Sequence, residues 1–251
     1  MRLTIIGCSG SGPSAASCAS CYLVEEDGFA IVVDLGSGAL VPLLGRMSVS
    51  GIGAIALSHL HADHCLDMVP LAVALHYGRE RPPQPIPVLA PAEAPRRLAQ
   101  ANYPGTPDSF FAELFAFTAV DGSTGSSQLG PFTVTTARMD HPVPTVGYRI
   151  TAGDRTLAYS GDTGPTAALV ELARDADTLL CEASWADGPE QQSNLHLTAA
   201  AAAEHATAAG VGRLLITHVP AWESSERAAA VAAEVFRGPV EAVTAGAQYE
   251  I

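Results

Sequence analysis

The sequence predicts a mixed fold of the α/β or α+β class, in which strands and helices build a site along the ends of strands. Hydrophobic residues make up 48% of the 251 residues, which is enough for a sizeable core. Apolar runs with strand spacing and runs with helical spacing alternate in two rounds along the chain. Several predicted strands end in histidine or acidic residues, which is typical of a site at a sheet edge. We treat residues 1–251 as a single domain.

The first part of the chain predicts an antiparallel set of strands joined by tight turns. These strands lie at 3–7, 21–26 and 29–36. The dipeptide Asp27-Gly28 is a typical hairpin turn between the second and the third. A further apolar run at 52–59 predicts a fourth strand, and helical spacing at 66–78 predicts that a helix follows it.

The middle of the chain predicts one short strand, a long helical region and a loop. The strand lies at 86–90. Residues 91–117 are predicted to be helical, with FFAELFAF at 110–117 as the apolar face. The glycine- and serine-rich residues 121–130 predict a flexible loop or turn.

The second half of the chain repeats the order of strands followed by helices. The predicted strands lie at 132–139, 145–151, 155–162, 177–184 and 212–220. A helix is predicted at 198–210, with Thr198 as its N-cap and Gly210 as its stop, and another at 225–238. The segment between Asp162 and Leu195 has room for one helix, one strand and a loop.

Composition and charge exclude several classes of partner. The formal net charge is −13, and the chain has no basic stripe of the kind that nucleic-acid-binding proteins use. It also has no apolar stretch of roughly 18 residues, the minimum for a membrane span. The first residues resemble a strand and a turn rather than a secretory signal. We therefore expect a cytoplasmic protein with no membrane partner, and the charge makes a nucleic-acid partner unfavourable.

The five cysteines, an odd number in a long chain, argue against a disulfide framework. They are Cys8, Cys18, Cys21, Cys65 and Cys181. The CASC run at 18–21 has no second CxxC or nearby histidine to complete a metal site. We expect ordinary reduced thiols, with a structural metal or a redox role for the first three as the alternative.

Residues 57–67, LSHLHADHCLD, gather metal-binding side chains directly after a predicted strand. Side chains alternate along a strand, so His59 and His61 point the same way, and the following turn can bring Asp63 and His64 to the same point. Imidazole and carboxylate suit zinc and other first-row metals. One metal cannot easily take all four ligands from so short a loop, whereas two neighbouring metals can share them.

SHLHADH resembles the HxHxDH signature of the metallo-β-lactamase superfamily, and the resemblance extends over nearly the whole chain. It implies a four-layer αββα sandwich with a metal pair at one edge of two sheets. It implies that His141, Asp162 and His218 complete the ligand set. It also implies that Asp34, in VVDLGSG, supports the site structurally.

By this resemblance, two divalent cations are the cofactors. His59, His61 and His141 would hold one cation, Asp63, His64 and His218 the other, and Asp162 would bridge them. Zinc is the default, with manganese or iron as alternatives. A hydroxide between two cations is a strong nucleophile near neutral pH. The resemblance names Asp63 and His196 as the catalytic residues.

The flanking residues favour one branch of the superfamily. HPVPTVGYRI is similar to the HxVxxxGYR pattern of the ribonuclease Z and cyclic phosphodiesterase branch. The runs IIGCSGSG, SHLHADHCLD, AYSGDTG and LCEASW resemble actinobacterial cyclic-nucleotide phosphodiesterases of this fold. The implied substrate is a small phosphodiester such as cAMP, and dimers are common in the fold. In this branch, a histidine placed like His196 protonates the leaving alkoxide. Trp185, Trp222 and Tyr148 are candidates to stack on a base, with core packing as the alternative.

Three other functions remain as alternatives. A ribonuclease Z-like endonuclease acting on tRNA 3′ ends would need a basic arm, and the segment before Leu195 is too short for one. A carboxylic ester or lactone hydrolase would not need His196. A metal-holding or redox protein would be expected to lack some of the seven ligands. An extra structural zinc of some relatives is not expected, because Ala221 replaces its histidine.

Overall fold

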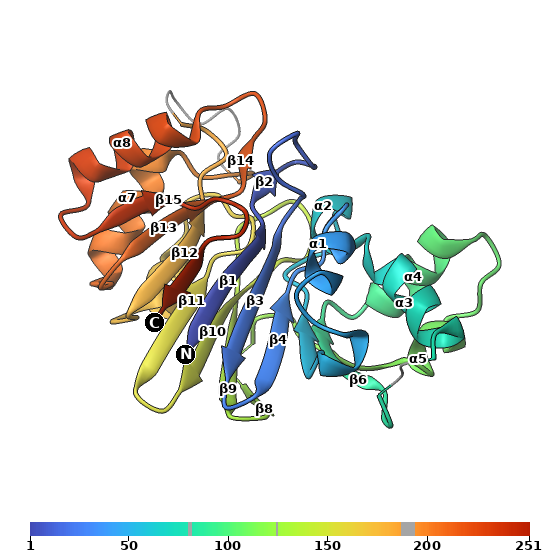
Figure 1. The fold of residues 1–251 in the computed structure, drawn as a ribbon. Helices are drawn as coiled ribbons and strands as arrows, with labels where there is room; N and C mark the ends of the chain where they lie inside the picture. The colour runs from blue at the N-terminus through green and yellow to red at the C-terminus, as the bar shows by residue number, and fades with distance from the viewer. Residues whose placement is uncertain (80–81, 124, 187–193) are drawn as a thin grey trace.

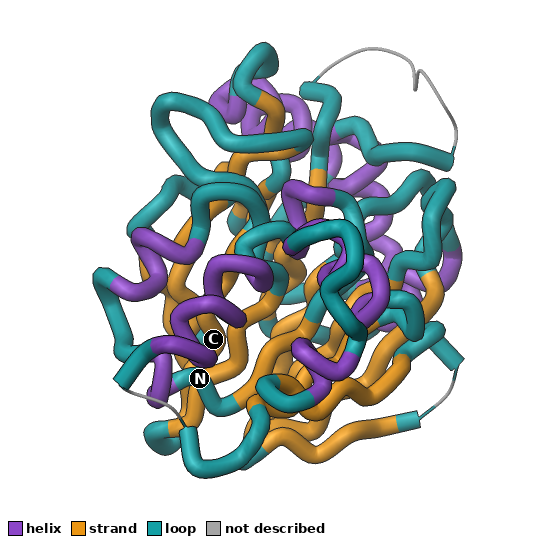
Figure 2. Tube along the Cα trace, turned by 90° about the vertical axis from the view of Figure 1, so that its right-hand side faces the viewer, coloured by secondary structure: helices purple, strands orange, loops and turns teal. Residues whose placement is uncertain are grey.

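The fold is a sandwich of two seven-stranded sheets, seen in a computed structural model that describes residues 1–79, 82–123, 125–186 and 194–251 (Figure 1). The two sheets face each other and helices cover both outer faces. Figure 2 shows the arrangement turned by 90°, with helices and strands in separate colours. The predicted four-layer αββα architecture is confirmed.

The first sheet has the strand order β16-β1-β3-β4-β5-β6-β7. Its strands are β1 (Arg2–Gly7), β3 (Cys21–Glu26), β4 (Phe29–Val33), β5 (Ala54–Ala56), β6 (Ile86–Ala90), β7 (Phe115–Ala119) and β16 (Gln248–Glu250). β1, β3 and β4 are antiparallel neighbours, as predicted, and β4 to β7 run parallel. Asp27 and Gly28 both have positive φ, so the predicted hairpin turn joins β3 and β4.

The second sheet has the order β15-β13-β12-β11-β10-β9-β8. Its strands are β8 (Ser126–Leu129), β9 (Phe132–Arg138), β10 (Val146–Ala152), β11 (Arg155–Tyr159), β12 (Thr178–Glu182), β13 (Leu214–Thr217) and β15 (Val240–Ala242). A short parallel pair, β2 (Ser9–Gly10) with β14 (Val219–Pro220), joins the beginning of the chain to its C-terminal part.

Two groups of helices flank the sheets (Figure 1). The first comprises α1 (Leu40–Leu44), the 3-10 turn η1 (Val49–Gly51), α2 (Ala62–Cys65), α3 (Met68–Tyr77), α4 (Ala94–Asn102) and α5 (Ser109–Ala112). The second comprises α6 (Ala167–Ala173), α7 (Ala199–Ala209) and α8 (Ser225–Val235). No helix among the described residues is long and apolar enough to cross a bilayer.

Three apolar clusters fill the three interfaces between the four layers. One packs α1, α3 and α4 against the first sheet, one lies between the two sheets, and one packs α6, α7 and α8 against the second sheet. In the central cluster, the rings of Tyr22 and Tyr159 lie 5.1 Å apart, and both are buried. Burial of these faces explains why the strands are so apolar on both sides.

The predicted helix over 91–117 is wrong in its second half. Helix α4 ends at Asn102, α5 is a single short turn, and Phe115–Ala119 form strand β7, parallel to β6. Pro104 and Pro107 interrupt the helical region, since proline cannot donate a backbone hydrogen bond. Along β7, Phe115 is buried and Ala116 is exposed, which is the alternation of a strand.

The predicted loop over 121–130 also requires correction. Ser126–Leu129 form β8, which pairs antiparallel with β9 as the edge strand of the second sheet. Of its four residues only Leu129 is buried, so its side chains carry little strand signal. Residue 124 lies outside the described residues.

The strands that lead to the site end a few residues earlier than the sequence predicts. β4 ends at Val33, β5 at Ala56, β11 at Tyr159 and β12 at Glu182. The polar residues that follow lie in turns beyond the strands. The predicted segment 212–220 contains two strands, β13 and β14, with His218 between them. The site is therefore built on the loops that leave the C-terminal ends of these strands.

Helix α7 begins and ends where the sequence predicts. The Thr198 hydroxyl accepts a hydrogen bond from the backbone N–H of Ala201 at 3.1 Å. Gly210 ends the helix in the left-handed conformation, with φ of 68°. The N-cap Thr198 lies two residues after His196, so the start of this helix fixes the backbone next to that side chain.

Candidate metal centre

The seven predicted ligands come from both sheets and meet at one edge of the sandwich. His59 and His61 lie in the loop after β5, and Asp63 and His64 lie in the short helix α2. The second sheet contributes three more ligands. These are His141 after β9, Asp162 after β11 and His218 after β13.

The structure brings these side chains together in overlapping groups. In each group, one ligand atom from every residue lies within 4.8 Å of the others. The groups are His59, His61, His141 and Asp162; Asp63, His64 and His218; and Asp162, His196 and His218. Asp162 Oδ1 lies 3.5 Å from His218 Nε2, so this carboxylate stands between the first two groups.

The nitrogen and oxygen atoms of the cluster are arranged as ligands of metal cations would be. His59 Nε2 lies 2.9 Å from His61 Nδ1, and His64 Nε2 lies 3.1 Å from His218 Nε2. Asp162 Oδ1 is buried and makes no hydrogen bond within the described part of the chain. A buried acceptor without a donor, beside nitrogens that face one another, is costly unless a cation satisfies it. Nitrogen and carboxylate ligands together are the set that zinc and related metals take.

Asp34 fixes His64 from outside the cluster. His64 Nδ1 donates to Asp34 Oδ2 at 2.8 Å, and the same oxygen accepts from the hydroxyls of Ser58 at 2.8 Å and Tyr159 at 2.7 Å. Oδ1 accepts from the Ser58 backbone N–H at 2.7 Å. These bonds leave His64 Nε2 directed at the cluster, which is how outer partners orient metal ligands. Asp34 thus occupies the supporting position that the sequence indicated.

Hydrogen bonds to Nδ1 also orient His141 and His218. His141 Nδ1 donates to the Leu195 carbonyl at 2.9 Å. His218 Nδ1 lies 3.0 Å from Ser184 Oγ, whose own proton goes to Glu182. The Nε2 atoms of both rings therefore face the other ligands of the cluster: that of His141 lies 3.4 Å from His61 Nδ1, and that of His218 lies 3.2 Å from Asp63 Oδ2.

Two backbone features hold the ligand loops close together. Asp34 and His218 have φ of 56° and 57°, a conformation that costs a non-glycine residue on the order of 1–3 kcal/mol. A Cβ at Gly36 would lie 1.9 Å from the Asp63 carbonyl oxygen, so only glycine allows α2 to pack this closely. The strain lies at the site, where the surrounding bonds compensate for it.

Burial and charge set the protonation states of the cluster. Burial lowers the pKa of His59, His61 and His141, which favours the neutral form that binds metal. Burial opposes ionisation of Asp162, but the neighbouring His218 and His64 side chains outweigh it and lower the pKa. Burial likewise opposes ionisation of Asp63, and the hydrogen bond from His218 still lowers its pKa. Both carboxylates are therefore ionised and ready to bind cations.

His196 lies beside both groups and is held by a carboxylate that the sequence did not assign. Its ring centroid is 5.7 Å from that of His141 and 5.5 Å from that of His218. His196 Nδ1 donates to Glu182 Oε1 at 2.9 Å. Burial alone would lower the pKa of His196, but the Glu182 carboxylate raises it to about 9. Glu182 thus favours the protonated form of His196.

Glu182 is a buried carboxylate of the candidate site that the sequence did not single out. It is buried, and it accepts hydrogen bonds from the backbone N–H groups of Thr163 at 2.8 Å and Ser184 at 3.1 Å. The available signal was its place as an acid at the end of a strand, as for the ligands. Its partner His196 is remote in sequence, so only the fold reveals the pair.

The aromatic candidates separate into different environments. Tyr148 is fully buried and its hydroxyl donates to the Leu57 carbonyl at 2.8 Å, so it belongs to the core. The Trp185 ring lies 5.7 Å from that of His196, and Trp222 is 73% exposed. Only the two tryptophans remain accessible to a ligand.

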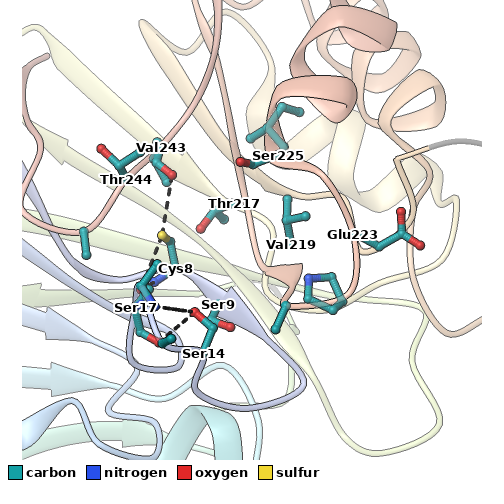
Figure 3. A pocket seen from close by; sticks show the side chains of 16 residues that line it. Cys8, Ser9, Ser14, Ser17, Thr217, Val219, Glu223, Ser225, Val243 and Thr244 are labelled. Carbon is teal, nitrogen blue, oxygen red and sulfur yellow. Dashed lines mark hydrogen bonds between the residues drawn. The ribbon is translucent and has the colours of Figure 1, made fainter.

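A cavity of about 410 Å³ borders strand β13 but contains none of the cluster residues (Figure 3). Cys8, Ser9 and Thr217 line it, and the Cys8 thiol lies 3.5 Å from the Val243 carbonyl. All five cysteines are free thiols. Burial raises the pKa of Cys8 and raises that of Cys18 to about 11, so neither is a reactive thiolate.

Comparisons with known proteins agree with this geometry. A family model described as a β-lactamase superfamily domain matches residues 31–219. An uncharacterized protein of Mycobacterium leprae is 40% identical over 255 residues, covering all of this chain and 89% of that protein. Ribonuclease Z of Chlamydia trachomatis is 26% identical over 286 residues, covering 93% and 92%. The crystal structure of the metallo-β-lactamase fold protein YhfI from Bacillus subtilis is 29% identical, covers 99% of both chains and superposes with a TM-score of 0.86.

Proposed function

The chain belongs to the β-lactamase superfamily and is a metal-dependent hydrolase, and from this premise we propose that it hydrolyses a small cyclic nucleotide of the cAMP type. The observation that carries the proposal is the pair of His196 and Glu182 beside the ligand cluster. An alkoxide is a poor leaving group and needs a proton as it departs. A partly buried imidazolium next to the cluster supplies that proton.

The seven ligands would hold two divalent cations, with zinc as the proposed metal. His59, His61 and His141 form one set, Asp63, His64 and His218 the other, and Asp162 is shared. When bound, such cations lower the pKa of water and neutralise the charge of a phosphoryl group. Elemental analysis of protein purified without added metal tests this assignment. Two equivalents of zinc are expected, and less than one equivalent of any divalent metal would contradict it.

The chain's own residues accept and supply the protons that the hydrolysis requires. A water oxygen forms a bond to phosphorus, and the bond from phosphorus to one ester oxygen breaks. Asp63, an ionised carboxylate that is 14% exposed, accepts a proton from the water. His196 gives its Nε2 proton to the departing oxygen, and Glu182 holds Nδ1 throughout. The product is a nucleoside monophosphate, and one water is consumed.

A ribonuclease Z-like activity is the second candidate, because a relative of that name aligns with nearly the whole chain. The net charge of −13 opposes it, since a polyanionic tRNA would be repelled. Between Asp162 and Leu195, helix α6 and strand β12 occupy much of the segment, and residues 187–193 of the predicted loop lie outside the described residues.

A substrate panel on metal-loaded protein decides among these functions. It comprises cAMP, cGMP, 2′,3′-cyclic nucleotides, bis(p-nitrophenyl) phosphate, pre-tRNA and a lactone. We expect turnover of the cyclic nucleotides and of the nitrophenyl diester. Activity on the lactone alone would overturn the phosphodiester proposal, and efficient cleavage of pre-tRNA would favour the endonuclease.

The His196→Ala variant tests the proton donor separately from the metals. Turnover of cAMP should fall by about 10²–10⁴-fold, the usual contribution of general acid catalysis. Bis(p-nitrophenyl) phosphate should lose much less, because nitrophenolate leaves without a proton. Both metals should remain bound. Loss of metal from the variant would show that His196 is a ligand instead.

A further inference from the structure

A second cavity, of about 370 Å³, shares a wall with the metal centre. Its lining includes His61, a predicted ligand, and Val143, two residues after His141. The cavity of Figure 3 has a similar size but contains no residue of the cluster. Of these two cavities, only the one beside His61 is continuous with the cluster, so it is the one that a substrate bound at the cluster can reach. Its volume lies within the range of small-molecule sites, roughly 300–1,000 Å³.

The chemistry of this cavity suits a flat apolar group with a polar edge. Leu60, Pro91, Val143 and Pro144 supply apolar surface. The two charged side chains of the lining, Glu93 and Arg97, both belong to the start of helix α4. They are four residues apart and so project from the same face of the helix. Aliphatic walls with one acceptor and one donor group form a site for a heterocycle.

Glu93 and Arg97 are available to a ligand. Both residues are exposed, and within the described parts of the chain neither side chain forms a hydrogen bond or an ion pair. Arginine donates to the N7 and O6 acceptors of guanine, adenine presents the same N7 acceptor, and a carboxylate accepts from the exocyclic amino group of a base. A purine carries acceptor and donor groups on one fused ring system, which matches this pair.

We propose that this cavity, defined by Leu60, Pro91, Glu93, Arg97, Val143 and Pro144, is a purine-binding subsite. The inference rests on the proposed function and specifies the base of its substrate. The phosphodiester lies at the cluster while the base enters beside His61, with its faces against the aliphatic residues. Its polar edge meets Glu93 and Arg97, which bind the base and take no part in the chemical step.

Product inhibition tests the subsite without requiring that cyclic nucleotides be hydrolysed. The assay uses methyl p-nitrophenyl phosphate, a diester without a base, and compares AMP, GMP, CMP and ribose 5-phosphate as inhibitors. We expect at least one purine monophosphate to inhibit about tenfold or more strongly than ribose 5-phosphate. Equal inhibition by all four compounds would overturn the subsite. CMP inhibiting as strongly as the better purine would overturn the assignment to purines.

Variants at the cavity edge test the two residues. In Glu93→Gln and Arg97→Gln, the ratio of kcat/KM for the cyclic purine nucleotide to kcat/KM for methyl p-nitrophenyl phosphate should fall. The fall should be about 5- to 150-fold, which corresponds to 1–3 kcal/mol of base discrimination. The advantage of the purine monophosphate over ribose 5-phosphate should shrink in parallel.

The matched control is Arg96→Gln, an exposed neighbour on α4 that does not line the cavity. In this variant, the ratio of kcat/KM for the cyclic purine nucleotide to kcat/KM for methyl p-nitrophenyl phosphate should equal that of the native protein. Equal losses on both substrates in Arg97→Gln would mean that Arg97 binds the phosphate, and the subsite would be wrong. If purine monophosphates inhibited more strongly than ribose 5-phosphate but no cyclic nucleotide were hydrolysed, the subsite would be supported. The proposal of a cyclic-nucleotide substrate would then be refuted.

Discussion

Asp34 connects the metal centre to the protein core at the level of a single oxygen atom. Its Oδ2 accepts from His64, Ser58 and Tyr159. In Asp34→Asn, the amide oxygen can take the place of Oδ1 and accept from the Ser58 backbone N–H. The NH₂ group then takes the place of Oδ2, where His64, Ser58 and Tyr159 each need an acceptor. Metal affinity of the second ligand set should weaken about 10- to 100-fold, as for other outer partners of metal ligands. A competition titration with a chromogenic chelator measures this change.

The matched control for this variant is Asp177→Asn. Asp177 Oδ2 accepts from the Thr156 backbone N–H at 2.7 Å, at the opposite end of β11 from the ligands. Its metal affinity should match the native protein. If Asp34→Asn bound both metals with native affinity, the supporting role of Asp34 would be refuted.

Glu182 sets the pH range in which His196 is protonated. The carboxylate raises the pKa of His196 to about 9, so the proton donor is present below that pKa and is lost as pH rises through it. In Glu182→Gln the pKa falls, and the alkaline limb of the kcat profile for cAMP should move to lower pH. Glu171→Gln, at an exposed ion pair with Arg174, should leave the profile unchanged. An unmoved alkaline limb in Glu182→Gln would separate Glu182 from the proton transfer.

Most side chains of the candidate site could be predicted at the residue scale, and their partners could not. The HxHxDH spacing places four ligands in six residues, and the remaining ligands follow apolar strands. By contrast, the contact of His196 with Glu182 and that of His141 with the Leu195 carbonyl join segments 14 and 54 residues apart. Such contacts depend on tertiary packing, which no local pattern specifies.

At the scale of elements, helix α7 positions His196 through its N-cap. Thr198 bonds the Ala201 N–H, and the Ala199 N–H donates to the Trp185 carbonyl at 2.9 Å. Thr198→Ala removes the cap and should lower the free energy of unfolding by about 1 kcal/mol. Denaturant titration measures this loss. Thr198→Ser keeps the hydroxyl and should recover most of the stability, and failure to do so would show that the methyl group matters more than the cap.

Element types were predictable where the end signals match the internal pattern. In α7, the N-cap and the final glycine bound a helical run, and in the β3–β4 hairpin, a turn dipeptide joins two apolar strands. Element types were not predictable where a strand lies at an edge or next to a helix of similar composition. The sequence predicts helix in the segment of β7 because the apolar residues of FFAELFAF fit helical spacing, but parallel pairing with β6 makes this segment a strand. The sequence predicts a loop at β8 because an edge strand needs few apolar residues and so carries little strand pattern.

At the scale of the whole molecule, the metals should contribute to stability as well as to catalysis. Asp63 and Asp162 share the cluster with His64 and His218, and nearly all of this charge is buried. Metal at about 1,000 times its Kd would add roughly 4 kcal/mol. For a chain of this size that corresponds to about 10 °C in Tm. Calorimetry with zinc and with excess EDTA measures the difference, which should vanish in Asp162→Ala. An unchanged Tm on chelation would contradict a metal-bound core.

The layer architecture could not be derived from periodicity alone. Local patterns define strands and helices, but the pairing of β1 with β16 joins residues nearly 250 positions apart. The sandwich was predictable because the HxHxDH signature resembles a superfamily with that architecture. Its confirmation rests on the two sheets and the three apolar clusters.

The order of the ligands along the chain has a consequence for biosynthesis. His59 leaves the ribosome first and His218 last, 159 residues later, and β14 can pair with β2 only after that. At about 5–20 residues per second, the nascent polypeptide waits roughly 10–30 s with an incomplete set of imidazoles. Cation capture by the second ligand set is therefore a late event, and a ribosome-stalled fragment ending before residue 214 should hold fewer ions than the released protein.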